Sequence, residues 1–451
     1  MRPSTASSPT APKRRPRRAA VGLLAMALTL QPLGGGAQAP QAADHRNALP
    51  ALGDAASEDF PVATERRLGD RIMRDVRRDR AYLDDPLLLD HLAPMWSGLL
   101  DAARARGHVP AELNEHFAFE LFLVRDRSVN AFALPGGYVG THLGLIAITT
   151  SPDELASVLA HELSHVTQRH IARSLGAGKT TSLVGVVGLI LGVLAASRSP
   201  EAANALISGG QAVSIQGQLN FSREVEREAD RVGFGVLTDA GHAAGGMAAM
   251  FEKLQQAARL NDSQNFPYLR THPLTTERIG EARTRAGARP APPARPAAYA
   301  LMQARARVLM DPRDVALQRE QGFDAPAALA ALPGPTERLA ALYASALASV
   351  LRRDADRADT ALAQARPLAA GDAPARRVLD LLALQNLVAR GDAGRAGALL
   401  DTLQAEPEGR AARALLIAEA QVALMPGARA GALQAAASRL QTQVALRADD
   451  A

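Results

Sequence analysis

The chain has 451 residues, a length that accommodates two domains or one large domain with an appendage. Hydrophobic residues make up 47% of it, which excludes a generally disordered protein. It contains no cysteine, which excludes disulfide bonds, thiol catalysis and cysteine-ligated zinc. Six of its positive charges lie within residues 1–43, so the formal net charge of +5 becomes −1 without that segment. The near-neutral charge of the remaining residues therefore gives no electrostatic reason to expect nucleic-acid binding.

The N-terminal residues have the pattern of an export signal. A basic stretch from Lys13 to Arg18 precedes the apolar run Ala19–Leu30, and small residues follow between Ala37 and Ala43. A membrane anchor is the alternative, but this run is short for a membrane span of about 20 residues. We therefore predict a signal peptide at residues 1–43 and an exported protein.

Residues 44–286 mix helical and strand patterns and hold nearly all of the candidate chemistry. Phe117–Val124 and Tyr138–Ile148 are predicted strands, separated by a turn at residues 135–137 (Pro-Gly-Gly). The apolar segment at residues 183–196 is interrupted by glycine and is too short for a comfortable transmembrane helix. We expect a buried helix there, and the alternative is a segment that contacts a membrane.

The segment from Ser151 to Gly176 is predicted to be helical. Ser151 is a suitable N-cap, Pro152 suits the first helical position, and Glu154 completes a capping box. Gly176 is a plausible C-terminal end of the helix. This helix contains the sequence HELSH.

Two histidines of this helix, His161 and His165, lie four residues apart and project from one face, where both can bind a single zinc ion. Glu162 can reach a water on that zinc and act as the general base. The alternative is an exposed charged face with incidental histidines. The apolar neighbours Val158 and Leu163 favour a buried helix instead, in which the polar groups need partners. His170 is predicted to be either an ordinary surface histidine or one that supports the site from outside.

A catalytic zinc needs a third protein ligand, and the polar helix expected at residues 222–233 offers one. One face of this helix carries four residues, Glu226, Ala229, Asp230 and Gly233. The small residues would let it approach the HELSH helix closely. Glu226 is therefore the predicted ligand, and Asp230 can accept the free N–H of a ligand histidine. Glu224 and Glu228 lie on another face and are expected to form solvated ion pairs with arginines; a merely exposed face is the alternative for Glu226.

The C-terminal third of the chain is predicted to be a separate helical region. Residues 287–298 form a Pro-rich linker, and residues 299–451 are rich in Ala and Leu. Arg395–Leu399 recurs at Arg429–Leu433, a spacing of 34 residues. A period of about 34 with paired helices is typical of tetratricopeptide (TPR) repeats, and a plain helical bundle is the alternative.

Four motifs together resemble a known family. HELSH at residues 161–165 and EREAD at residues 226–230 are similar to the HExxH…ExxxD peptidases, which include the prenyl-protein (CAAX) proteases and the HtpX heat-shock protease. Asn130–Ile146 and Thr271–Ile279 extend the resemblance. The export signal and the C-terminal repeats make the chain similar to the periplasmic, BepA-like branch. The implied fold is α+β and mostly helical, a zincin-type peptidase domain with a small β-sheet followed by an all-α TPR-like domain.

The resemblance also implies site residues. It makes Glu226 the third ligand, in agreement with the helix-face argument, and implies one Zn²⁺ per chain. It implies an edge strand near Tyr138–His142 that binds the substrate backbone by strand addition. The substrate-binding residues would then be Gly137, Tyr138, Val139 and Gly140. His272 would either stabilise the tetrahedral intermediate or occupy the fourth zinc position as a reversible plug, although the residues alone are equally compatible with a loop histidine beside Pro273.

The predicted function is that of a periplasmic zinc metalloendopeptidase that cleaves misfolded or stalled envelope proteins. Its expected partners are those protein substrates and, through the TPR-like region, the outer-membrane β-barrel assembly machinery. The alternative is a chaperone or scaffold that acts through its helical repeats, with low or regulated proteolysis.

Overall fold

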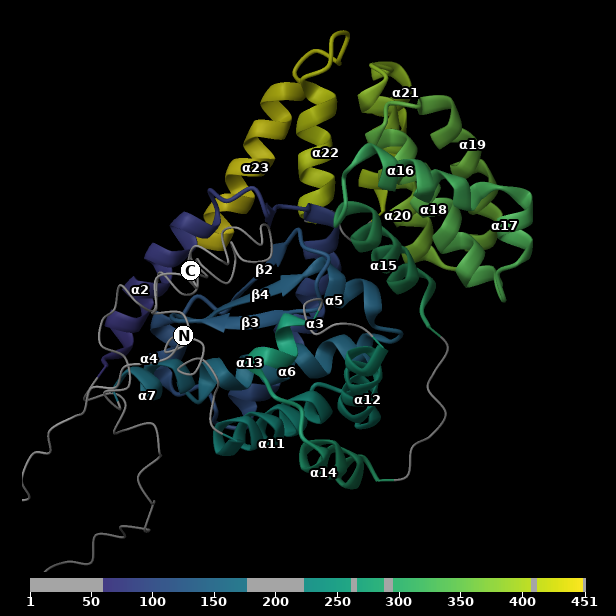
Figure 1. The fold of residues 1–451 in the computed structure, drawn as a ribbon. Coiled ribbons are helices and arrows are strands. Elements are labelled where there is room, and N and C mark those ends of the chain that lie inside the picture. The colour runs from purple at the N-terminus through teal and green to yellow at the C-terminus, as the bar shows by residue number, and fades with distance from the viewer. Residues whose placement is uncertain (1–59, 177–222, 261–265, 288–294, 407–411, 449–451) are drawn as a thin grey trace, which may run out of the picture. The chain divides into compact units, whose positions relative to one another are not determined.

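The computed structural model describes residues 60–176, 223–260, 266–287, 295–406 and 412–448 (Figure 1). The predicted signal peptide, most of the predicted linker and the apolar segment 183–196 lie outside the described residues. Within the described ranges, no helix is both long and apolar enough to span a bilayer. The predicted mostly helical chain with a small sheet is confirmed.

The sheet has four strands in the order β1-β2-β4-β3. Their bounds are β1 Tyr82–Leu83, β2 Glu120–Val124, β3 Ala131–Leu134 and β4 Tyr138–His142. β2 and β4 are parallel, whereas β1 with β2 and β3 with β4 are antiparallel. β4 therefore has a neighbour on each side, and β3 is an edge strand of the sheet as described.

The predicted strand pair is wrong in its details. β3 intervenes between the two predicted strands, and Leu143–Ile148, expected to continue the second one, forms helix α5. Short apolar runs have no periodicity that separates a strand from a buried helix, so only the packing decides. The predicted glycine turn does occur, between β3 and β4, with positive φ at Gly136 and Gly137.

The predicted edge position of Tyr138–His142 is also wrong, because β4 lies inside the sheet. Gly140 pairs with Phe132 on one side and Phe122 on the other. A Cβ at Gly140 would overlap both phenylalanine rings, so the glycine serves close packing within the sheet.

The HELSH helix, α6 (Pro152–Thr167), packs against the sheet at β3 (Figure 1). The predicted start is confirmed, since Ser151 Oγ accepts the N–H of Glu154 at 3.2 Å. The predicted single helix is wrong, because α6 ends at Thr167 and a separate helix, α7 (His170–Gly176), follows and ends at the predicted residue. Between them Arg169 has a left-handed backbone with φ of 51°.

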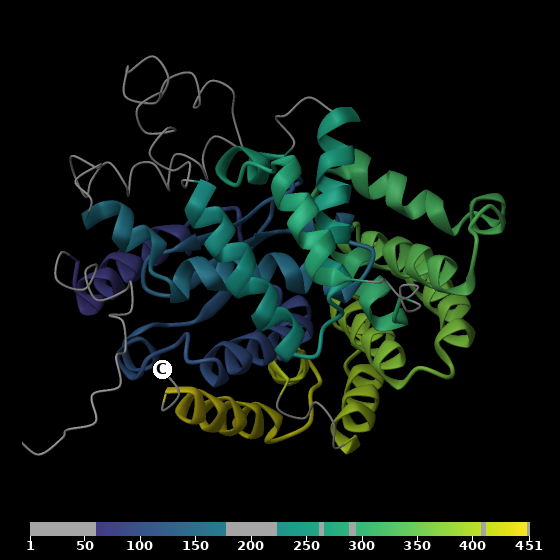
Figure 2. The same ribbon diagram turned by 90° about the horizontal axis from the view of Figure 1, so that it is seen from below.

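Among the described residues of this part of the chain there are seven further helices: α2 (Val62–Val76), α3 (Pro86–Ala105), α4 (Ala111–His116), α11 (Arg223–Asp239), α12 (Gly245–Leu260), α13 (Pro267–Thr271) and α14 (Thr276–Ala286). Both α11 and α12 pack against α6. In Figure 2 these teal helices lie in front of the blue α6. α6 is consequently buried between the sheet and a second helical layer.

The C-terminal residues form consecutive helices: α15 (Ala297–Leu309), α16 (Asp314–Gln321), α17 (Pro326–Ala330), α18 (Pro335–Leu351), α19 (Ala355–Ala365), α20 (Ala373–Ala389), α21 (Ala393–Ala405), α22 (Arg413–Ala423) and α23 (Ala432–Ala448), with short 3₁₀ turns η2 (Gly322–Asp324) and η3 (Arg366–Ala369). Neighbours pack in pairs, α18 with α19, α20 with α21 and α22 with α23. The assignment of these pairs to TPR repeats stays a prediction.

Helix α15 is bound to the earlier part of the chain by polar contacts. Arg305 forms a buried bidentate ion pair with Asp85, the N-cap of α3, at 2.7 and 2.8 Å. The hydroxyls of Tyr299 and Thr149 are 2.7 Å apart. A hydrophobic core continues across this contact. The residues before and after the predicted boundary at 298 thus share one hydrophobic core. The assignment of two domains stays a prediction.

Candidate metal centre

Four buried side chains from two helices and the end of a third converge on one point beside the sheet. His161 and His165 come from α6, Glu226 from α11, and His272 follows the last residue of α13. One ligand atom from each lies within 4.8 Å of every other. All four residues are at most 3% exposed. The structure therefore brings together the three predicted ligands and the predicted fourth group.

The distances within this cluster suit a zinc ion. Tetrahedral ligands on bonds of about 2.0–2.1 Å lie about 3.3 Å apart. His165 Nε2 and His161 Nε2 are 3.0 Å apart, and His161 Nε2 and His272 Nδ1 are 3.4 Å apart. Glu226 Oε1 lies 3.0 Å from His272 Nδ1 and 3.6 Å from His165 Nε2, and Glu226 Oε2 lies 3.6 Å from His161 Nε2. Imidazole and carboxylate donors are those of catalytic zinc sites, so the residues present fit the metal.

The close approach of α11 to α6 depends on small side chains, as the sequence predicts. Ala229 is fully buried, and a Cβ built at Gly233 would lie 3.1 Å from Ala160 O and 3.1 Å from His161 N. A larger residue at Gly233 would meet the backbone turn that carries His161. The glycine therefore sets the distance at which Glu226 faces the two histidines.

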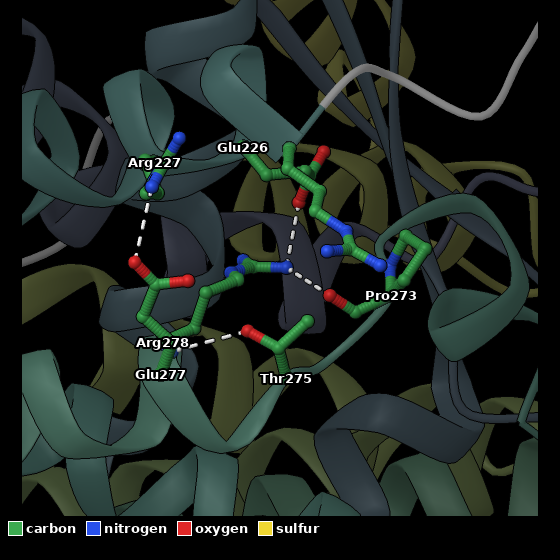
Figure 3. A pocket seen from close by; sticks show the side chains of 7 residues that line it. Glu226, Arg227, Pro273, Thr275, Glu277 and Arg278 are labelled. Atoms are coloured by element: carbon green, nitrogen blue, oxygen red, sulfur yellow. Dashed lines mark hydrogen bonds and ion pairs between the residues drawn. The ribbon is translucent and has the colours of Figure 1, made fainter.

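A buried arginine that the sequence reasoning did not single out joins the acidic residues of α11. Arg278 donates to both carboxylate oxygens of Asp230, at 2.6 and 2.8 Å. Its Nη1 lies 2.8 Å from Glu226 Oε2 (Figure 3). Asp230 Oδ1 in turn lies 3.0 Å from His161 Nδ1. Arg278 is only 4% exposed. Arg278 belongs to the Thr271–Ile279 motif, and that membership was the feature of the sequence that could have pointed to it.

The general-base candidate, Glu162, is fully buried. Neither of its oxygens has a hydrogen-bond partner among the described residues. His272 Nε2 lies 3.6 Å from Glu162 Oε1. A buried carboxylate is costly without a partner, so this group suits a site that is completed by a metal and a water.

The electrostatics of the cluster favour the ligand forms of two residues. Burial lowers the pKa of His165 well below its ordinary value, so the ring is neutral, as a metal ligand must be. Burial opposes ionisation of Glu226, but His272 and His161 outweigh it and hold the pKa of that carboxyl well below its usual range. Burial also lowers the pKa of His161, but Asp230 and Glu226 raise it to about 10, so a proton on this ring competes with a metal.

One predicted feature of α11 is wrong. Glu228, expected to form a solvated ion pair on the outer face, packs against α7. Its Oε2 lies 3.1 Å from His170 Nε2 and accepts from Arg173 at 2.9 Å. Glu228 does lie on a different face of α11 from Glu226, as predicted, but the sequence does not show that α7 covers that face. Arg227 instead pairs with Glu277 at 3.0 Å (Figure 3).

The predicted substrate-binding residues lie apart from the free edge of the sheet. Gly137 precedes the interior strand β4, which contains Tyr138, Val139 and Gly140. The Tyr138 hydroxyl donates to Asp70 of α2 at 2.6 Å. Helix α6 packs against both β3 and β4, and of these two strands β3 is at the edge of the sheet as described.

Comparison with known proteins points to one class. Residues 99–286 match the model of "Peptidase family M48". The beta-barrel assembly-enhancing protease of Escherichia coli K12 is 35% identical over 56% of this chain and 50% of its own length. The Yersinia pestis protein of that name is 34% identical over 58% of this chain and 52% of its own length. The mitochondrial metalloendopeptidase OMA1 of Schizosaccharomyces pombe is 30% identical over 36% of this chain and 44% of its own length. The chain thus spans about half the length of the curated relatives it matches.

Proposed function

We propose that this chain, whose residues 99–286 match the model of peptidase family M48, is a zinc-dependent endopeptidase. The observation that carries the proposal is the buried cluster of His161, His165, Glu226 and His272. Their ligand atoms all lie within 4.8 Å of one another, and three of the contacts are 3.0–3.4 Å. Glu162 follows the first ligand and has the burial and position of a general base. Relatives named as metalloendopeptidases support the same reaction.

Each residue has a role that follows from its contacts. Zinc, when bound by His161, His165 and Glu226, supplies Lewis acidity to the attacking water and the scissile carbonyl. Glu162 removes the proton of the attacking water and passes it to the leaving amine. Asp230, whose Oδ1 lies 3.0 Å from His161 Nδ1, supports that ring in its ligand orientation.

His272 is proposed to regulate the same centre. Its Nδ1 lies 3.4 Å from His161 Nε2 and 3.0 Å from Glu226 Oε1, the position of a fourth ligand. In this position it acts as a reversible plug, because a catalytic zinc needs one position for water. When His272 moves toward a bound substrate, the same imidazole can stabilise the oxyanion.

The proposed substrates are unfolded or misassembled proteins of the cell envelope. The edge strand β3 lies beside α6, so an extended substrate added to it would pass the metal centre. An added strand is recognised mainly through its backbone, which compact proteins do not offer. The N-terminal export pattern supports a periplasmic location. The names of the relatives support a link to β-barrel assembly, with the TPR-like helices as the contact.

A second candidate function is a chaperone that acts through the C-terminal helices. A pocket between α19, α20 and α21 favours it, lined by Asp359, Leu362, Arg366, Leu387, Arg395 and Leu399 among others. Its lining combines apolar side chains with a few charged ones, as ligand-binding pockets do.

The test measures zinc content and casein cleavage for the wild type, Glu162→Gln and His272→Ala. We expect about one zinc per chain in all three, no cleavage by Glu162→Gln and faster cleavage by His272→Ala. Normal cleavage by Glu162→Gln, or no zinc in the wild type, would refute the peptidase. Slower cleavage by His272→Ala would favour oxyanion stabilisation over the plug. Suppression of protein aggregation by Glu162→Gln would support the chaperone candidate.

A further inference from the structure

A chain of polar side chains extends from the zinc ligand His165 away from the metal centre. Nδ1 of His170 lies 2.8 Å from Nδ1 of His165. On its other side, Nε2 of His170 lies 3.1 Å from Oε2 of Glu228. Arg173 donates to the same Glu228 oxygen at 2.9 Å. His170 is 1% exposed, so these contacts form in the protein interior.

A backbone reversal places His170 there. In a continuous helix, residues five positions apart point about 140° away from each other, so His165 and His170 would not meet. Arg169 breaks the helix with φ of 51°, a left-handed conformation that L-residues other than Asn and Asp rarely adopt. Its buried side chain pairs with Glu65 at 3.0 Å and with the Phe60 carbonyl, and these contacts hold the strained turn. Strain maintained by tertiary contacts is characteristic of functional sites.

The contacts define one arrangement of protons. His165 Nε2 faces the other ligand atoms, so in the neutral ring Nδ1 carries the hydrogen. This Nδ1–H donates to His170, whose Nδ1 must accept. Nε2 of His170 then carries a hydrogen and donates to Glu228. Arg173 donates to the same carboxylate oxygen, so Glu228 accepts from both side chains in this arrangement.

We propose that His170 is a positioning residue for the zinc ligand His165, and that Glu228 anchors it. Through Nδ1, His170 fixes the tautomer and the ring plane of His165, and makes His165 Nε2 a stronger donor. The two ligand histidines then have different supports, a carboxylate (Asp230) for His161 and a histidine for His165. This inference rests on the proposed zinc function.

The test compares zinc affinity, measured by competition with a chelator, for four full-length proteins: the wild type and three variants. His170→Phe removes the acceptor, whereas His170→Asn keeps an acceptor atom near the Nδ1 position. The matched control is His242→Phe, because His242 also contacts a carboxylate of α6, Asp153, at 2.9 Å but touches no ligand. Loss of a group that orients a ligand typically weakens metal binding 10–100-fold.

We expect His170→Phe to lose about 10–100-fold in zinc affinity. His170→Asn should recover most of that loss, and His242→Phe should match the wild type. In the activity assay, kcat should fall for His170→Phe while KM stays constant, because substrate binding is not touched.

Wild-type zinc affinity in His170→Phe would overturn the inference and leave the proposed function intact. Equal loss of affinity in His170→Phe and His170→Asn, with equal loss of metal-free stability, would also overturn it, since the role would then be structural. Absence of zinc from the wild type would refute both.

Discussion

The close approach of α11 and α6 at Gly233 makes a quantitative prediction. An alanine in a helix interior is usually more stable than glycine by about 1 kcal/mol. At Gly233 the added Cβ would lie 3.1 Å from Ala160 O and from His161 N, a few tenths of an ångström inside ordinary contact. Overpacking of this kind costs about 1–3 kcal/mol. We therefore expect Gly233→Ala to be neutral or destabilising by up to about 2 kcal/mol, and Gly233→Val to be worse.

The matched control is Gly280→Ala in α14, because Gly280 is exposed and a Cβ added there would have no atom within 4 Å. That change should stabilise the protein by up to about 1 kcal/mol. Urea denaturation of the metal-free proteins measures both effects. Chelator competition should also show weaker zinc binding in Gly233→Val, because the displaced α11 carries Glu226. If Gly233→Ala stabilises as much as Gly280→Ala, and Gly233→Val binds zinc like the wild type, the helix contact does not control the site.

Three further predictions concern stability. Arg305→Ala leaves Asp85 buried without its partner and should lower the free energy of unfolding by about 3–5 kcal/mol in urea denaturation. Arg429→Ala, at an exposed ion pair, should leave that free energy nearly unchanged. Similar losses of stability in the two variants would refute the importance of burial. Burial lowers the pKa of His91 to about 4, so the unfolded chain binds more protons than the folded one between pH 6.5 and 4. The free energy of unfolding should therefore fall by up to roughly 3 kcal/mol as the pH drops through that window. If His91→Leu shows the same dependence of stability on pH, His91 is not its cause. Free zinc at about 100 times its dissociation constant should stabilise the wild type by about 2.7 kcal/mol, an effect that a chelator reverses and that should be weak in His165→Ala; equal stabilisation of both would place the metal elsewhere.

Several local features could be predicted from the sequence because they depend on neighbours along the chain. The N-cap at Ser151 and the four-residue spacing of His161 and His165 are properties of one helix. The shared face of Glu226, Ala229 and Gly233 is likewise a matter of helical periodicity. Those patterns nominated three of the residues that converge on the candidate metal centre, whereas His272 was implied by the family resemblance alone.

Other features depend on packing between segments that are distant in sequence. β4 became an interior strand because β2 pairs with it in parallel, and α5 formed where a longer strand was expected. The turn at Arg169 depends on Glu65, about a hundred residues earlier, and it brings His170 to His165. Arg278 reached both Glu226 and Asp230 only through the approach of α14 to α11.

The sequence by itself thus determined the chemistry of the ligands and the faces on which they lie, because helical periodicity and capping act within a few residues. The tertiary structure alone decided the strand order, the arginine that joins the two acidic residues and the support of His165. Those features require burial of polar groups against partners from other elements, and only the folded chain selects the partners.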